Sequence, residues 1–281
     1  MNLSLKKFDM SMIKNDSVVV FIGKRNTGKS YLIKDLLYNH RNMPVGTVIS
    51  GTEGANSFYS NMVPKIFIHH EYKPEVIENF MKRQKKMVTM LAKDRQRGIS
   101  VEESKIDPRA FIILDDCMYD KSWVNDVNVR NLFMNGRHYH ALFIIALQYA
   151  IGIPPVLRTN IDFVFILREN IVKNRMRLYE NYAGMFPTFD VFSKVMDACT
   201  ENFECLVIHN GAKSNKIQDQ VFWYKAESHD DFRIGHPSIW QYYNQNYREN
   251  DDDEEENNEY DPAKDKNAKK KGTYLTITKY S

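Results

Sequence analysis

The stretch Val18–Leu37, VVVFIGKRNTGKSYLIKDLL, contains the pattern that decides the fold. Gly23 is followed by four residues and then by Gly28, Lys29 and Ser30, which is the spacing of a phosphate-binding loop. The backbone amides of such a loop surround a triphosphate, its lysine reaches the β- and γ-phosphates, and its serine is a ligand of Mg²⁺. The pattern therefore predicts ATP and Mg²⁺ as cofactors.

The residues on either side of the loop fit this interpretation. Residues 17–22 form a β-branched apolar run that predicts a buried strand, and apolar residues recur at helical spacing in residues 31–37. The loop then connects a strand to the N-terminus of a helix, which is where anion sites form. The residues expected to contact the nucleotide are Gly23, Lys24, Arg25, Asn26, Thr27, Gly28, Lys29, Ser30 and Tyr31.

Further apolar runs alternate with helical patterns along the chain. Each run is continuous, which is typical of strands buried on both faces of a parallel sheet. We predict an α/β fold, a three-layer P-loop NTPase with a largely parallel central sheet. The further runs are residues 46–51, 65–70, 110–116, 141–148 and 162–167, and the helical segments between them include residues 30–39, 75–96 and 123–135.

The pattern changes after residue 167. Two helices are expected at residues 171–182 and 189–199, followed by a hairpin of residues 203–210 and 219–226 that extends the sheet. We assign residues 1–248 to one ATPase domain. Residues 249–261 contain nine acidic residues and no Lys or Arg, and six lysines follow, so residues 249–281 are expected to form an acidic and then lysine-rich disordered tail.

Composition restricts the class of protein. The formal net charge is +3, and because the acidic stretch contributes nine negative charges, the remainder of the chain is clearly basic, as expected for a protein that attracts nucleic acid. The three cysteines show no metal-binding spacing and are expected to be free thiols in a reducing compartment. No apolar run approaches the roughly 20 residues of a membrane helix, so we expect a soluble protein without membrane insertion.

A pair of acids follows the apolar run that ends in FIILDD, residues 111–116. A triphosphate site needs a carboxylate for hydrated Mg²⁺, usually at the end of a second strand. We assign Asp115 to this role, with Ser30 as the other metal ligand from the protein. Asp116 is the predicted general base that activates the attacking water.

The next apolar run ends in Gln148. If its strand lies between the loop strand and the aspartate strand, the amide of Gln148 lies near the γ-phosphate and can orient water or sense hydrolysis. Two arginines flank this run and are candidates to stabilise the transferring phosphoryl group from a neighbouring subunit. We favour Arg137, which precedes the run, over Arg158, which follows it.

Three motifs together resemble a known family. They are GKRNTGKS (residues 23–30), FIILDD, and GRHYHALFIIALQ (136–148) followed by IPPVLRTNIDFVFIL (153–167). In this order they are similar to the genome-packaging ATPases of nucleocytoplasmic large DNA viruses, relatives of the FtsK and HerA DNA pumps, over about residues 18–167. Asp116 stands where many relatives have Glu.

The resemblance implies an additional-strand, RecA-like fold of the FtsK–HerA type. It implies a homo-oligomeric ring that hydrolyses ATP to translocate double-stranded DNA into a viral capsid, with a capsid or membrane-vertex protein as a further partner. It also implies a location at the virus assembly site in the host cytoplasm or in the virion.

A basic helical segment is the candidate DNA contact, because Lys and Arg side chains bind backbone phosphate irrespective of sequence. A solvated basic helix face is the alternative interpretation. The segment bears Lys82, Arg83, Lys85, Lys86, Lys93, Arg95 and Arg97.

Other functions remain open for a protein with this loop. A small-molecule P-loop kinase also uses the loop and Mg²⁺, although adjacent acids and a polar strand end suit water activation better than transfer to a bound hydroxyl. A nucleotide-gated scaffold with weak turnover is a third possibility. A GTPase is disfavoured because the sequence has no NKxD-type motif.

Overall fold

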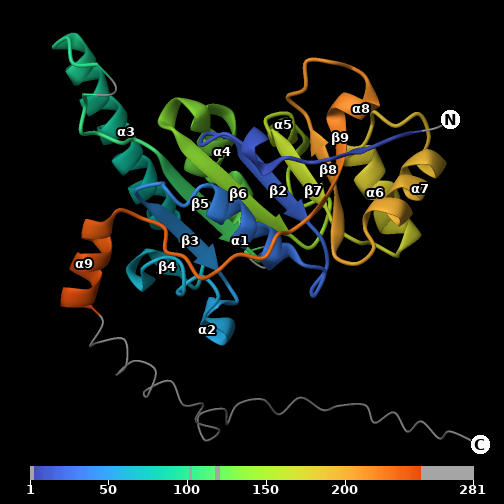
Figure 1. Ribbon diagram of the computed structural model, residues 1–281, viewed down its shortest axis with the longest axis horizontal. Helices are drawn as coiled ribbons and strands as arrows, with labels where there is room; N and C mark the ends of the chain where they lie inside the picture. Colours follow the sequence, from blue (N-terminus) through green and yellow to red (C-terminus); the bar gives the residue numbers. More distant parts are fainter. Residues whose placement is uncertain (1–2, 101–102, 118–120, 248–281) are drawn as a thin grey trace, which may run out of the picture. The chain divides into compact units, whose positions relative to one another are not determined.

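A mostly parallel β-sheet organises the chain (Figure 1). The computed structural model describes residues 3–100, 103–117 and 121–247. Within these ranges the sheet has nine strands in the order β1-β9-β8-β7-β2-β6-β5-β3-β4. The strands are β1 (Lys6–Lys7), β2 (Val18–Ile22), β3 (Gly46–Ser50), β4 (Ile68–His69), β5 (Ala110–Asp115), β6 (Ala141–Leu147), β7 (Phe163–Ile166), β8 (Glu204–His209) and β9 (Val221–Lys225).

Helices cover both faces of the sheet. Successive residues of a strand point to opposite faces, so alternate residues of β2 pack against different helices. Val19 and Phe21 of β2 belong to the hydrophobic cluster that includes the apolar residues of helix Lys29–Asn39. Val20 and Ile22 belong to the cluster that includes buried residues of four other helices, Pro74–Gln96, Val127–Asn135, Val172–Tyr182 and Phe189–Cys199. The three-layer α/β prediction is therefore confirmed.

The helices have the following bounds. The α-helices are α1 (Lys29–Asn39), α2 (Glu53–Asn56), α3 (Pro74–Gln96), α4 (Val127–Asn135), α5 (Pro155–Arg158), α6 (Val172–Tyr182), α7 (Phe189–Cys199), α8 (Ile217–Gln220) and α9 (Pro237–Asn246). Short 3-10 helices occupy Met10–Met12, Lys65–Phe67, Lys121–Asn125 and Gly136–Tyr139.

The strand pairing determines which residues meet at the carboxyl edge of the sheet. β6 pairs in parallel with β2 on one side and with β5 on the other. This is the additional-strand arrangement that the resemblance to the FtsK–HerA ATPases implied. β8 pairs antiparallel with both β7 and β9, so the predicted hairpin is present and extends the sheet.

Two expected elements differ from the structure. Residues 65–70, predicted as one strand, contain a 3-10 helix and the two-residue strand β4. Pro64 begins this turn, since its carbonyl accepts a hydrogen bond of 2.9 Å from the amide of Phe67, and a short apolar run does not by itself distinguish a strand from a helical turn. Residues 123–135, predicted as one helix, divide at Asp126, whose side chain caps the N-terminus of α4.

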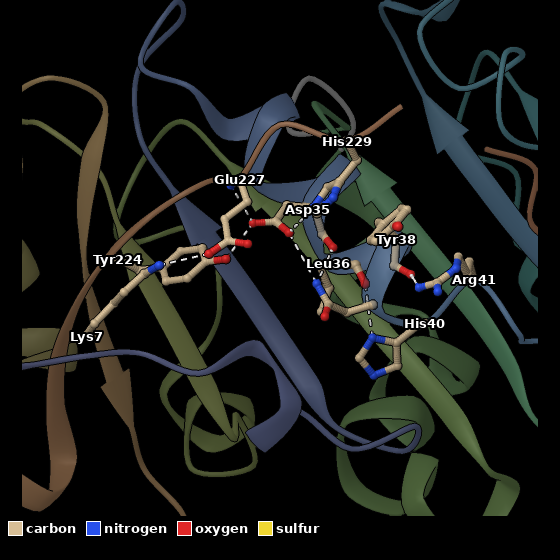
Figure 2. Close-up of polar contacts among 10 residues, drawn as sticks. Lys7, Asp35, Leu36, Tyr38, His40, Arg41, Tyr224, Glu227 and His229 are labelled. Atoms are coloured by element: carbon tan, nitrogen blue, oxygen red, sulfur yellow. Dashed lines mark hydrogen bonds and ion pairs between the residues drawn. The ribbon is translucent and has the colours of Figure 1, made fainter. Parts of the chain in front are cut away.

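After β9, residues 226–236 cross the outer side of α1 (Figure 1); we call them the C-terminal strap. Asp35 of α1 is buried and accepts hydrogen bonds from the strap, at 2.6 Å from His229 Nε2 and 3.0 Å from the amide of Glu227 (Figure 2). The Tyr224 hydroxyl of β9 donates a third at 2.6 Å. His229 also stacks on Tyr38 with ring centroids 3.8 Å apart. These contacts fix α1 against the end of the sheet.

The chain divides into a compact unit, Met1–Gln241, and a second unit that begins at Tyr242. The predicted boundary at residue 248 and the predicted tail of residues 249–281 lie outside the described residues. Among the described helices none is both long enough and apolar enough to span a bilayer. Cys117, Cys199 and Cys205 are buried, and none of the three forms a disulfide bond.

Candidate nucleotide-binding site

The predicted phosphate loop joins β2 to α1, and two of its glycines are required by its geometry. Gly28 precedes the helix with φ of 103°, a left-handed conformation that glycine adopts without strain. A Cβ added at Gly23 would lie 2.7 Å from both Leu167 Cβ and Thr27 Oγ1, so no larger residue fits there. The loop therefore closes tightly, with its final amides at the N-terminus of α1.

Lys29 points back into this loop. Its Nζ donates hydrogen bonds to the carbonyl oxygens of Gly23 at 2.5 Å and Lys24 at 3.0 Å. Burial lowers the pKa of Lys29, while the nearby carboxylates of Asp115 and Asp116 raise it. The amine is thus held among loop carbonyls and two acids. Of the other loop residues, Arg25, Asn26, Ser30 and Tyr31 are exposed.

Asp115 ends β5 and is buried, with 8% of its surface exposed. Its Oδ2 accepts a hydrogen bond of 2.9 Å from the hydroxyl of Tyr59. Burial raises the pKa of the Asp115 carboxyl, and Tyr59 and Lys29 lower it. A buried carboxyl that has one fixed donor and lies near the loop lysine is suited to hold a cation.

Asp116 and Gln148 touch each other. Gln148 Nε2 donates to Asp116 Oδ1 at 2.5 Å, because β6 brings the end of its strand beside the end of β5. Asp116 has φ of 54°, which is uncommon for a residue other than glycine. Residues with such uncommon backbone conformations are found more often at functional sites than elsewhere. The structure thus brings the predicted base and the predicted sensor together at the loop edge.

Several residues of the site were not identified from the sequence. Tyr59 is 1% exposed, and burial together with Asp115 raises the pKa of its hydroxyl, so it stays a donor. Glu53 is buried and accepts from the amides of Tyr59 at 2.9 Å and Ser60 at 2.7 Å, which fixes that turn. Neither Tyr59 nor Glu53 belongs to one of the sequence motifs described above.

Glu169 is a further addition, because it ties the loop to α6. It follows β7, is buried, and forms an ion pair of 2.6 Å with Nζ of Lys24. It also accepts from the amide of Ile171 at 2.8 Å, just before α6 begins. Its position after the apolar run 162–167, at the same edge as the loop, is the one sequence signal that marks it.

The candidate arginines lie away from this chain's own loop. β6 is parallel to β2, so Arg137, which precedes β6, stands at the opposite edge of the sheet, and a seven-residue strand spans roughly 23 Å. Arg137 pairs with Asp162 at 3.2 Å, just before β7 begins. Arg158 hydrogen-bonds Asn181, and its guanidinium lies 5.7 Å from the ring centroid of Tyr182. Any role of either arginine from a neighbouring subunit remains a prediction.

The residues around the phosphate loop have the chemistry needed to hold a triphosphate with its Mg²⁺ ion. Among the described residues no three His, Cys, Asp or Glu side chains gather into a closed metal cage. Mg²⁺ does not need one, since it keeps several waters and takes one or two carboxylates together with phosphate oxygens. Asp115 and Ser30 would supply such ligands, and the loop amides with Lys29 would supply the donors that phosphates require.

Relatives of the chain come from large DNA viruses, while no protein-family model matches it. It is 39% identical over 223 residues to uncharacterised protein L437 of Acanthamoeba polyphaga mimivirus, covering 79% of this chain and 77% of that protein. It is 39% identical over 259 residues to uncharacterised protein 075L of Invertebrate iridescent virus 6, covering 88% and 95%.

Solved structures with the same fold include a viral genome packaging NTPase and a conjugation coupling protein. The genome packaging NTPase B204 of Sulfolobus turreted icosahedral virus 2, in complex with AMP, has a TM-score of 0.51 at 15% identity and covers 77% of this chain and 100% of that one. The pCW3 conjugation coupling protein TcpA with ATPγS has a TM-score of 0.53 at 14% identity and covers 77% and 62%. The likeness establishes a P-loop NTPase fold.

Proposed function

Because the chain belongs to a family of proteins that large DNA viruses share, with members in mimivirus and Invertebrate iridescent virus 6, we propose that it is an ATPase that translocates double-stranded DNA during genome packaging. One observation carries the catalytic part of this proposal. The contact between Gln148 and Asp116 pairs a candidate sensor with a candidate base beside the phosphate loop. This arrangement suits attack by water.

The proposed roles follow from position. Lys29 and the loop amides bind the phosphates, and Ser30 and Asp115 hold Mg²⁺, which supplies charge neutralisation when bound. Asp116 accepts the proton of the attacking water, and Gln148 orients that water. An arginine of the neighbouring subunit, Arg137 or Arg158, would complete the site in a homo-oligomeric ring.

The DNA part of the proposal is supported by charge and by the fold. B204, which shares the fold, is described as a genome packaging NTPase. The exposed lysines of α3 offer contacts to backbone phosphate, which a translocase needs because it moves along any sequence. A capsid or membrane-vertex protein is the expected docking partner, at the assembly site or in the virion.

The test is steady-state ATP hydrolysis by the purified chain, with and without linear double-stranded DNA, over a series of salt concentrations. We expect DNA to stimulate hydrolysis and the stimulation to decrease as salt rises. Lys29→Ala is the control that should abolish turnover in every condition. Lys34→Ala, about one and a half turns further along α1, is its matched control and should retain wild-type turnover.

Other outcomes would select other functions. Transfer of phosphate to a nucleoside, with ADP formed independently of DNA, would indicate a small-molecule kinase. Tight ATP binding without phosphate release, with or without DNA, would indicate a nucleotide-gated scaffold. Either result would contradict the translocase proposal.

A further inference from the structure

An aromatic side chain in the turn before β8 lies beside the phosphate loop. Because β8 runs antiparallel to β7, it begins at the edge of the sheet where β7 ends, which is also the loop edge. A Cβ added at Gly28 would lie 3.6 Å from Phe203 Cδ1 and 3.9 Å from Phe203 Cβ. Phe203 is nevertheless 67% exposed. The ring therefore lies next to the loop, within van der Waals reach of a side chain at position 28, and most of its surface is open to solvent.

The backbone of this turn is unfavourable for the residue that occupies it. Asn202 and Phe203 have φ of 52° and 63°. Asn tolerates this left-handed region, but a bulky aromatic residue rarely adopts it. Exposure of a large apolar ring and its placement in this conformation both oppose folding stability. Neither is explained by packing of the core.

We propose that Phe203 is the surface on which the base of the bound nucleotide stacks. This inference rests on the proposed function, because it needs triphosphate on the loop. Phosphates held at the N-terminus of α1 leave the nucleoside directed away from the loop, and the ring next to Gly28 is in position to receive it. The charged neighbours of the turn, Arg168 and Glu201, pair with each other at 3.9 Å beside the exposed aromatic ring.

The experiment compares a ligand that has a base with one that lacks it. Calorimetric titration of the full chain, with Mg²⁺ present, gives affinities for a non-hydrolysable ATP analogue and for inorganic tripolyphosphate. The variants are Phe203→Ala, Phe203→Gly and Phe203→Trp. Phe203→Gly removes the ring and relieves the backbone, since glycine adopts positive φ freely, so it should fold at least as well as the parent. Tyr242→Ala removes an aromatic residue of similar exposure, 54%, elsewhere in the chain.

We expect Phe203→Ala and Phe203→Gly to weaken binding of the analogue by between about fivefold and a hundredfold, the range that stacking of one base supports. Binding of tripolyphosphate should stay unchanged, Phe203→Trp should retain wild-type affinity, and Tyr242→Ala should affect neither ligand.

Three results would overturn the inference. Unchanged affinity of Phe203→Gly for the analogue would mean that no stacking occurs. Equal loss of both ligands would mean that Phe203 only shapes the loop through Gly28. In both cases wild-type binding leaves the proposed function intact. If the wild-type chain binds neither ligand, the proposed function fails and this inference fails with it.

Discussion

Asp116 combines a left-handed backbone with a hydrogen bond from Gln148, and this combination leads to a prediction at the scale of one residue. Asp116→Asn keeps an oxygen that can accept from Gln148 but removes the basic carboxylate. We expect ATP binding to be unchanged and hydrolysis to fall by a factor of about 10² to 10⁴, the usual contribution of a general base. Binding by calorimetry and phosphate release by a coupled assay test the two parts.

The matched control for this change is Asp230→Asn, an exposed acid of the C-terminal strap. It should leave both binding and hydrolysis unchanged. Normal turnover by Asp116→Asn would show that another group activates the water.

The site residues at the ends of predicted strands could be identified from the sequence. Asp115, Asp116 and Gln148 each follow an apolar run, and parallel strands bring such ends to one edge. Tyr59 could not be identified from the sequence. It lies in an irregular segment between β3 and β4, and its role comes from the hydrogen bond that it donates to Asp115. Tertiary contacts of this kind leave no spacing pattern.

At the scale of elements, the attachment of α1 to the C-terminal strap depends on Asp35. Its carboxylate is 1% exposed and accepts from Tyr224, Glu227 and His229. Asp35→Ala leaves these three donors, of which the Tyr224 hydroxyl is buried, without their acceptor, so we expect the free energy of unfolding to fall by about 2–4 kcal/mol. Urea denaturation measures this difference.

Asp231→Ala serves as the comparison, because Asp231 reaches the same helix through an exposed ion pair of 3.4 Å with Lys34. Exposed pairs contribute roughly 0–1 kcal/mol, so a loss in Asp35→Ala no larger than that of Asp231→Ala would contradict the role assigned to Asp35.

A second element-scale prediction concerns the end of α1, where His40 is buried between the carbonyl oxygens of Leu36 and Ile13. Burial lowers the pKa of His40 more than the two carbonyls raise it. The unfolded chain then takes up a proton at higher pH than the folded chain. Stability due to this residue is complete above about pH 6.5 and decreases as the pH falls toward the folded pKa.

His40→Asn should therefore reduce the dependence of unfolding free energy on pH between about 7 and 5. The slope should not vanish, because burial also lowers the pKa of His69 and His209. His138→Asn, at an exposed position, is the matched control and should change the slope less than His40→Asn does. An unaltered slope in His40→Asn would mean that His40 already titrates normally.

Sequence patterns located long, buried elements better than short ones. Helix α7 has the predicted bounds, and α3 and α6 differ from the predictions by one residue at their starts. The strands β1 and β4 each contain two residues at the margins of the sheet, where pairing and not an apolar pattern defines them.

At the scale of the whole molecule, the basic residues of α3 are the proposed contact with DNA. Lys85→Glu combined with Lys86→Glu reverses two exposed charges. We expect weaker binding of linear duplex DNA and a salt dependence whose slope is reduced by about two, since each phosphate contact contributes roughly 0.9. Fluorescence anisotropy over a salt series measures both quantities.

The control is Lys213→Glu combined with Lys216→Glu, which makes the same change in net charge between β8 and β9. If both double variants lose DNA binding equally, the attraction depends on overall charge and not on α3.

Overall topology was largely predictable, because continuous apolar runs alternate with helices and each pattern reflects burial on one or both faces. The order of strands was predictable only in part. The position of β6 between β2 and β5 was implied by the resemblance to the FtsK–HerA ATPases, whereas the parallel pairing of β1 with β9 joins residues far apart in the sequence and had no local signal.

The contacts between α1 and the end of the domain also determine when the domain can complete its folding during synthesis. Asp35 precedes Tyr224 and His229 by 189 and 194 residues. Translation therefore produces the phosphate loop and its helix long before the groups that satisfy the buried carboxylate emerge from the ribosome. Contacts between such distant residues form late and slowly. A nascent chain halted before the strap would carry the complete loop motif on a helix whose buried acid still lacks its partners.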